Sequence, residues 1–155
     1  SVIFPSHQPY SPLPVEHEKV RPFIKDVTPA FFKHIDLNLQ HGDMPFSGSD
    51  NSSLAGWMRF KVPPSKFLVD THILALADAW PPTLLQLASN PSPASSMSWY
   101  IEFLNEPQLD KTAWLGFEAT THHCAQGYGM EDAKIYSPDG KLLAISRQTV
   151  AIFDN

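Results

Sequence analysis

This sequence has very little cysteine: Cys124 is the only one in 155 residues. A single cysteine excludes a disulfide within the chain and is typical of a reducing compartment, so we expect a cytoplasmic location. Long hydrophobic runs are also missing, since none approaches the ~20 apolar residues that span a bilayer. We therefore expect no membrane partner. The chain begins with Ser1 rather than methionine, so the lack of a targeting peptide carries little weight.

Positive charge and several catalytic motifs are scarce as well. The net charge is −5 and no stripe of lysines or arginines is present, which argues against nucleic acid as a partner. Neither Gly-x-Ser-x-Gly nor His-Glu-x-x-His occurs, so neither an α/β-hydrolase nor a zinc protease of that type is supported. Cys124 follows His122 and His123, but neighbouring strand residues point to opposite faces and no second ligand cluster exists. We expect a structural or surface role for these three residues.

What the sequence does contain is typical of one globular domain. Its 155 residues are 43% hydrophobic and 17% charged, enough to bury a real core. Proline is abundant at the start, where six of the fifteen prolines lie within residues 1–30. Because proline disfavours packed helices and strands, we expect residues 1–29 to be an extended connector and residues 30–155 to form the domain.

Alternating polar and apolar residues predict several β-strands, over 31–40, 54–62, 96–104, 113–122, 129–136 and 142–153. Pro138 and Gly140 stand where a hairpin turn favours them, between the last two strands. One helix-length apolar run covers 70–80; Pro81 and Pro82 end it, and an extra turn follows at 83–87. A helix that is apolar on all sides is usually buried. The pattern predicts an α+β fold in which a curved antiparallel sheet wraps around this helix.

Asp78 is the one acid in the last turn of the predicted helix, among aliphatic residues and Trp80. Burial and the partial negative charge of a helix C-terminus both disfavour a charged carboxylate. That setting suits a general base working near neutral pH. A solvated acid at a frayed helix end, or a cap for the following loop, explains the same residue without any function.

Gln148 lies in line with aliphatic residues along the final predicted strand. The row Leu142, Ala144, Ser146, Gln148, Val150 and Ile152 is the plausible core-facing one. A buried amide needs hydrogen-bond partners, which a loop carbonyl can supply. A carboxylate on a central helix and an amide on the surrounding sheet can instead hold one water between them.

With these features in place, the chain resembles the acyl-CoA thioesterase II (TesB-like) family, in its C-terminal hotdog half. The segments that carry the resemblance occur in the family's order: Trp57-Met-Arg-Phe60, Leu76-Ala-Asp-Ala-Trp-Pro-Pro82, Ser96-Met-Ser-Trp-Tyr-Ile-Glu-Phe103, Gly127-Tyr-Gly129 and Asp139-Gly-Lys-Leu-Leu-Ala-Ile-Ser-Arg-Gln148. They cover roughly residues 30–154. The resemblance implies a hotdog fold, two such units forming a double hotdog, and hydrolysis of acyl-CoA to fatty acid and CoA without a cofactor or metal.

The family's hydrolytic trio falls on Asp78, Ser96 and Gln148. Asp78 would be the general base for a water that Ser96 and Gln148 hold. The family prefers threonine where Ser96 stands. Ser95 and Ser98 are close enough that the position of the site hydroxyl stays open by a residue or two. The CoA phosphates would need basic side chains, for which the candidates are Arg59, Lys61, Lys66 and Arg147.

This chain corresponds to only one half of the double unit, so we expect a homodimer or pairing with an N-terminal hotdog half, with the acyl-CoA cleft between the units. Two other functions stay open. One is a non-catalytic hotdog that binds an acyl group or a partner. The other is a hotdog hydratase, which needs a His/Asp pair on the helix; His72 and Asp78 fall on opposite helix faces, which counts against it.

Overall fold

The computed structural model describes residues 29–63, 67–107 and 109–153. Its elements are, in chain order, the 3-10 helix η2 (Ala30–Lys33), strands β1 (Ile35–His41) and β2 (Ser53–Phe60), helix α1 (Asp70–Asp78), the 3-10 helix η3 (Thr83–Gln86), and strands β3 (Ala94–Phe103), β4 (Leu115–Ala125), β5 (Tyr128–Tyr136) and β6 (Leu142–Ile152). Of the predicted connector 1–29, residues 1–28 lie outside the described residues.

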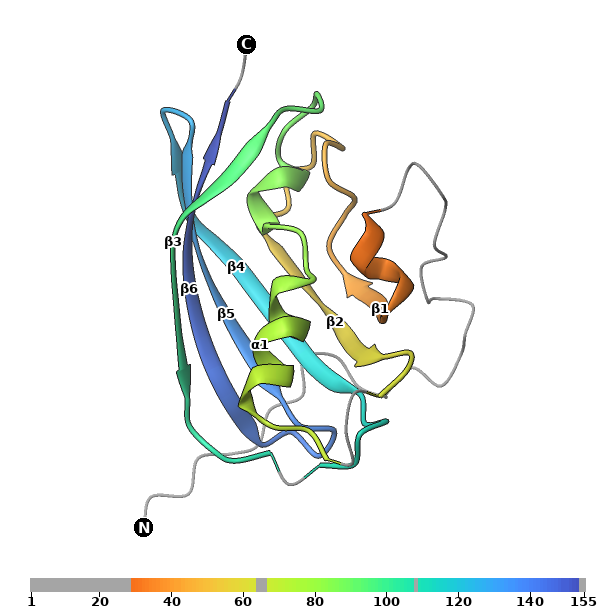
Figure 1. Cartoon of the computed structure of the whole chain (residues 1–155). Helices are drawn as coiled ribbons and strands as arrows, with labels where there is room; N and C mark the ends of the chain where they lie inside the picture. Colours follow the sequence, from red (N-terminus) through yellow and green to blue (C-terminus); the bar gives the residue numbers. More distant parts are fainter. Residues whose placement is uncertain (1–28, 64–66, 108, 154–155) are drawn as a thin grey trace.

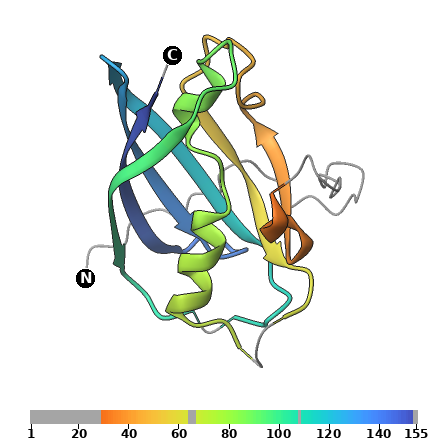
Figure 2. The same cartoon turned by 45° about the horizontal axis from the view of Figure 1, so that its top comes forward.

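The six strands form one antiparallel sheet in the order β1-β2-β4-β5-β6-β3. The sheet curves around α1, which lies on its concave side between the two edge strands β1 and β3 (Figures 1 and 2). The core fills the space between α1 and this concave side. Its wholly buried members include Met58, Ile73, Leu76, Leu115 and Ile135. The predicted antiparallel sheet around one helix is therefore confirmed.

Helix α1 is less completely buried than its sequence predicts. The side chains that it buries are Ile73, Leu76 and Ala77. Thr71, Ala75 and Asp78 are exposed and form one stripe along the opposite face, at the spacing of successive helical turns. A single curved sheet covers one side of a helix, and the other side, with Thr71, Ala75 and Asp78, stays uncovered. The expectation of burial on all sides is wrong for this unit.

Several predicted boundaries shift by a few residues. The alternation over 31–40 begins in a 3-10 helix, so β1 starts only at Ile35. Strand β4 extends to Ala125, because Gln126 and Gly127 have φ of 52° and 79° and form the tight turn into β5. The predicted hairpin turn between β5 and β6 is present, with Gly140 at φ 85°.

Trp80 fixes the end of α1 against the sheet. Its ring stacks on Phe117 with centroids 4.9 Å apart, and its Nε1 donates to Met58 Sδ at 3.1 Å. Gly56 on β2 makes this approach possible, since a Cβ there would lie 2.9 Å from the Trp80 ring. The residue two positions before Trp80 is Asp78, whose place relative to the sheet is fixed in turn.

Candidate active site

A cavity of about 260 Å³ lies between the C-terminal end of α1 and the inner side of the sheet. Asp78 from α1, Ser96 from β3 and Gln148 from β6 all line it. These are the three residues that the resemblance selects, and they come from separate parts of the chain. The fold thus brings all three to one cavity.

Ser96 and Gln148 are in direct contact. Gln148 Nε2 donates a hydrogen bond to Ser96 Oγ. The β3–β6 register shifts between Ser96 and Ser98. This bulge changes the alternation of side chains, so that Ser96 and Trp99 both line the cavity although they stand three positions apart, which in a regular strand would put them on opposite faces. Ser95 also lines the cavity, and Ser98 does not. Of these three serines, Ser96 is the one whose hydroxyl is bonded to Gln148.

Asp78 is exposed, and its predicted burial is wrong. It lies on the open stripe of α1, where the sheet of this chain does not cover it. Among the described residues, its carboxylate makes no hydrogen bond or ion pair. The carboxylate is therefore available to a ligand or to a second protein unit.

A larger cavity of about 670 Å³ adjoins the first. The two share Asp78, Trp80, Pro82 and Leu85. The wall of the larger cavity is mostly apolar: η2, β1 and the following loop contribute Phe31, Phe32, Leu37, Leu39, Met44, Pro45 and Phe46. The loop is held in place by η3, since Gln86 Oε1 accepts from Asp43 N–H at 2.7 Å and Phe46 N–H donates to the Leu85 carbonyl at 2.7 Å. Asp78 thus stands between a polar and an apolar space.

Glu131 is a second carboxylate in the smaller cavity, which the sequence interpretation missed. It is only 6% exposed, and its Oε2 accepts hydrogen bonds from Thr83 N–H at 2.6 Å and Thr83 Oγ1 at 2.8 Å. Burial raises the pKa of Glu131, and the Thr83 bonds only partly offset this effect. A signal was present: Glu131 alternates in line with Ala133 and Ile135, as Gln148 does with its aliphatic neighbours.

The basic residues that were candidates for CoA phosphates face away from this cavity. Arg147 alternates with Ser146 and Gln148, and it pairs with Asp132 at 2.7 Å. Arg59 and Lys61 both approach Asp36, at 3.1 and 3.7 Å. Lys66 lies outside the described residues. Pairing to carboxylates on the outer face leaves the three described residues poorly placed to bind a phosphate near Asp78.

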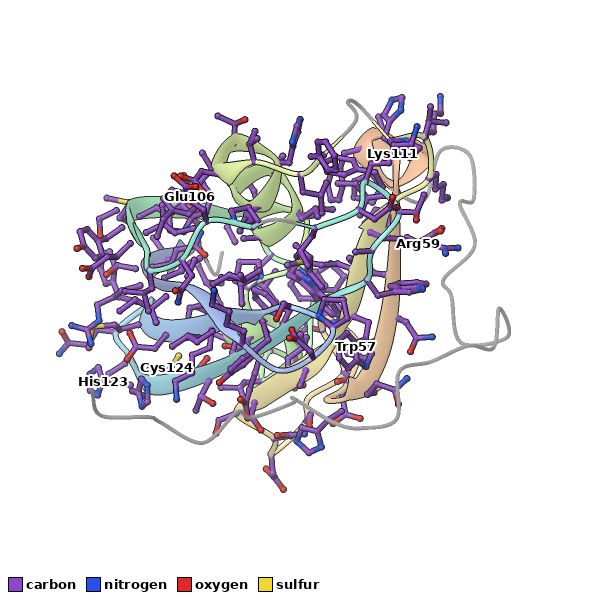
Figure 3. The ribbon with its side chains drawn as sticks, turned by 90° about the horizontal axis from the view of Figure 1, so that it is seen from below. Trp57, Arg59, Glu106, Lys111, His123 and Cys124 are labelled. Carbon is purple, nitrogen blue, oxygen red and sulfur yellow. The ribbon has the colours of Figure 1, made fainter. Side chains whose placement is uncertain are left out.

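His72 and the histidine–cysteine cluster lie elsewhere. His72 Nδ1 accepts from Val69 N–H at 3.0 Å at the start of α1, at the other end of the helix from Asp78. Figure 3 shows His123 and Cys124 at the outer end of the sheet, away from α1. Across residues 29–63, 67–107 and 109–153, no three His, Cys, Asp or Glu side chains are grouped to hold a metal, and no helix is long and apolar enough to cross a membrane.

A curved antiparallel sheet wrapped around one helix defines the hotdog fold. The family model described as acyl-CoA thioesterase C-terminal domain matches residues 10–152. The chain belongs to this family. No curated protein matches the sequence.

Solved structures agree on the fold. A conserved protein of unknown function with a hot dog fold, from Alicyclobacillus acidocaldarius, has a TM-score of 0.75 at 21% identity; the match covers 100% of this chain and 59% of that one. A putative thioesterase II from Thermobifida fusca has a TM-score of 0.67 at 19% identity and 99% and 57% coverage. A hypothetical thioesterase solved with coenzyme A, from Streptococcus pneumoniae, gives 0.57 at 13%, with 77% and 87% coverage. The chain thus spans less than two thirds of the first two proteins.

Proposed function

We propose that this chain forms the hydrolytic part of an acyl-CoA thioesterase. The observation that supports this most is the meeting of Asp78, Ser96 and Gln148 in one cavity, in a chain of the acyl-CoA thioesterase C-terminal domain family. A free carboxylate beside a hydrogen-bonded hydroxyl and amide is suited to activating water.

In the proposed reaction, Ser96 and Gln148 hold a water and Asp78 removes its proton. The hydroxide oxygen bonds to the thioester carbonyl carbon, and the C–S bond then breaks. CoA leaves as a thiolate that takes up a proton, and the acyl group leaves as the fatty acid. Positioned base catalysis contributes roughly 10²–10⁴-fold, so hydrogen-bond donors to the carbonyl oxygen must supply the rest.

The larger apolar cavity is the proposed site of the acyl chain. It is contiguous with the polar cavity through Asp78, Trp80 and Pro82, so a chain lying in it would reach the proposed catalytic group. Its aromatic and aliphatic wall matches the chemistry of a hydrocarbon tail.

A second hotdog unit is part of this proposal. The exposed stripe of α1 leaves Asp78 uncovered, and the solved proteins that match this chain over its whole length are considerably longer. A second copy of the chain, or an N-terminal hotdog half, would cover Asp78 and exclude bulk water from it.

The decisive experiment compares Asp78→Asn with the wild type in the intact native polypeptide. We expect kcat for acyl-CoA hydrolysis, followed by thiol release, to fall roughly 10²–10⁴-fold while acyl-CoA still binds. Gln148→Ala should lose less, because Gln148 positions the water and does not accept its proton. Asp70→Asn, at the other end of the same helix, is the matched control and should retain full activity.

The alternative is a hotdog that binds an acyl group without hydrolysing it. Calorimetry with acyl-CoA separates the two functions. Wild-type protein that binds acyl-CoA but releases no thiol would contradict the thioesterase proposal and favour the binding module. Asp78→Asn protein that hydrolyses acyl-CoA at the wild-type rate would instead contradict the role of Asp78 as general base.

A further inference from the structure

One polar row crosses the largely apolar concave face of the sheet. Thr121 of β4 pairs with Glu131 of β5, which pairs in turn with Gln148 of β6. Gln148 then pairs with Trp99 of β3. Directly opposed residues on antiparallel strands share a face, with Cβ atoms ~4.5–5.5 Å apart. Glu131 is therefore the immediate neighbour of Gln148 in the proposed catalytic group.

Glu131, Thr83 and Thr121 form a buried hydrogen-bonded cluster. Thr83 is 1% and Thr121 7% exposed, and their Oγ1 atoms lie 2.5 Å apart. Thr83 also donates to Glu131 from both its backbone N–H and its hydroxyl. A buried carboxylate is costly even when hydrogen-bonded, and an apolar side chain of similar size often packs equally well. Packing alone therefore does not account for a glutamate at this position.

The cluster ties the sheet to the segment that carries Asp78. Thr83 is the first residue of η3, and Pro81 and Pro82 join it to the end of α1. The fixed φ of proline makes this connection stiff. A displacement of Thr83 is therefore transmitted to the end of α1. Glu131 contacts Thr83 and adjoins Gln148, so it links the two sides of the cavity.

We infer that Glu131 is a positioning residue, which holds the Asp78 end of α1 at its working distance from the Ser96–Gln148 pair. The inference rests on the proposed thioesterase function and adds a fourth residue to it. Glu131 acts through Thr83, and its acceptor oxygen is the feature that matters. A glutamine keeps such an acceptor, whereas an alanine does not.

The test compares Glu131→Ala and Glu131→Gln with wild-type protein and Asp78→Asn in the intact native polypeptide. Small misplacements of catalytic groups cost on the order of 10²-fold, so we expect Glu131→Ala to lose about that in kcat with little change in KM. Glu131→Gln should recover most of the activity. Asp36→Ala is the matched control, since Asp36 is also a buried carboxylate but pairs with Arg59 on the outer face; it should keep the wild-type kcat even if it lowers Tm.

Hydrogen exchange at the backbone amides of Trp80 and Thr83 gives a readout that does not need turnover. We expect faster exchange at both in Glu131→Ala, and not in Glu131→Gln or Asp36→Ala. Wild-type kcat in Glu131→Ala, or unchanged exchange at these amides, would overturn the inference. Glu131→Gln as inactive as Glu131→Ala would also overturn it and would indicate a proton-transfer role. A wild type that does not hydrolyse acyl-CoA would instead refute the proposed function. The exchange data would still show whether Glu131 holds Thr83 and the end of α1 in place.

Discussion

Glu131 carries a buried carboxylate that accepts two hydrogen bonds, both from Thr83. Burial disfavours its charged form more than these bonds favour it, so its pKa is raised above the ordinary 4.5. The folded protein therefore binds a proton at this side chain at pH values where the unfolded chain has lost it. This difference links the stability of the fold to pH.

The pH dependence of stability gives a prediction for Glu131. The contribution of this group is fully present below the unfolded pKa and is lost as the pH rises through the higher folded pKa. Glutamine cannot ionise, so Glu131→Gln avoids that loss. The Tm of Glu131→Gln minus that of wild type should grow as the pH rises from about 4 to 8. Scanning calorimetry across that range measures it, and a difference that is constant or shrinks would contradict the prediction.

Single residues also show where prediction from sequence succeeds. The alternation that placed Gln148 on an inward row is a local property of one strand, and Gln148 does line the cavity. The hydroxyl beside it depends on a bulge in β3, which alternation alone does not reveal. The prediction that Asp78 is buried was wrong, because how much of a helix is covered depends on the extent of the sheet and not on the helix sequence.

The elements were largely predictable because each has its own period or turn signal. All six strands and α1 form where alternation, the helix-length apolar run and the prolines indicate. The hairpin after Tyr136 follows from Pro138 and Gly140. The exception is η2, which occupies the start of the predicted strand 31–40. Phe31 and Phe32 there stack on each other with centroids 4.6 Å apart and line the larger cavity.

The contribution of β1 to that cavity gives a prediction about substrate length. Leu39 on β1 is half-buried and lines the cavity. Leu39→Trp should fill part of this space, so kcat/KM should fall much more for long-chain than for short-chain acyl-CoA. Both values are measured on one preparation, so their ratio does not depend on how much of the protein is folded. A change in the ratio therefore reports on the space available to the acyl chain. An unchanged ratio would contradict acyl binding in this cavity, and Leu39→Phe provides a milder second variant.

At the scale of the whole molecule, β3 is an unusual edge strand. Residues 94–100 are exposed on both faces of the strand, and three of them are large and apolar: Met97, Trp99 and Tyr100. Natural sheets normally protect their edges with charge, proline or a covering segment, because an open edge pairs with other chains. The other edge, β1, is buried or half-buried along its length. The exposed stripe of α1, including Asp78, is likewise uncovered in this chain.

These exposed surfaces predict association through β3. We expect the 155-residue chain to sediment as a dimer at micromolar concentration, with β3 at the interface, because pairing there satisfies the open edge and buries its apolar side chains.

Met97→Lys places a charge at that interface and should shift the protein toward monomer. Val62→Lys is the matched control, since Val62 is also an exposed apolar residue but lies outside β3 and lines neither cavity. A wild-type chain that stays monomeric, and binds no second hotdog unit, would contradict the prediction. A dimer that Met97→Lys leaves intact would place the interface elsewhere. Dimerisation that also raises thioesterase activity, with both lost together in Met97→Lys, would link the covering of Asp78 to catalysis.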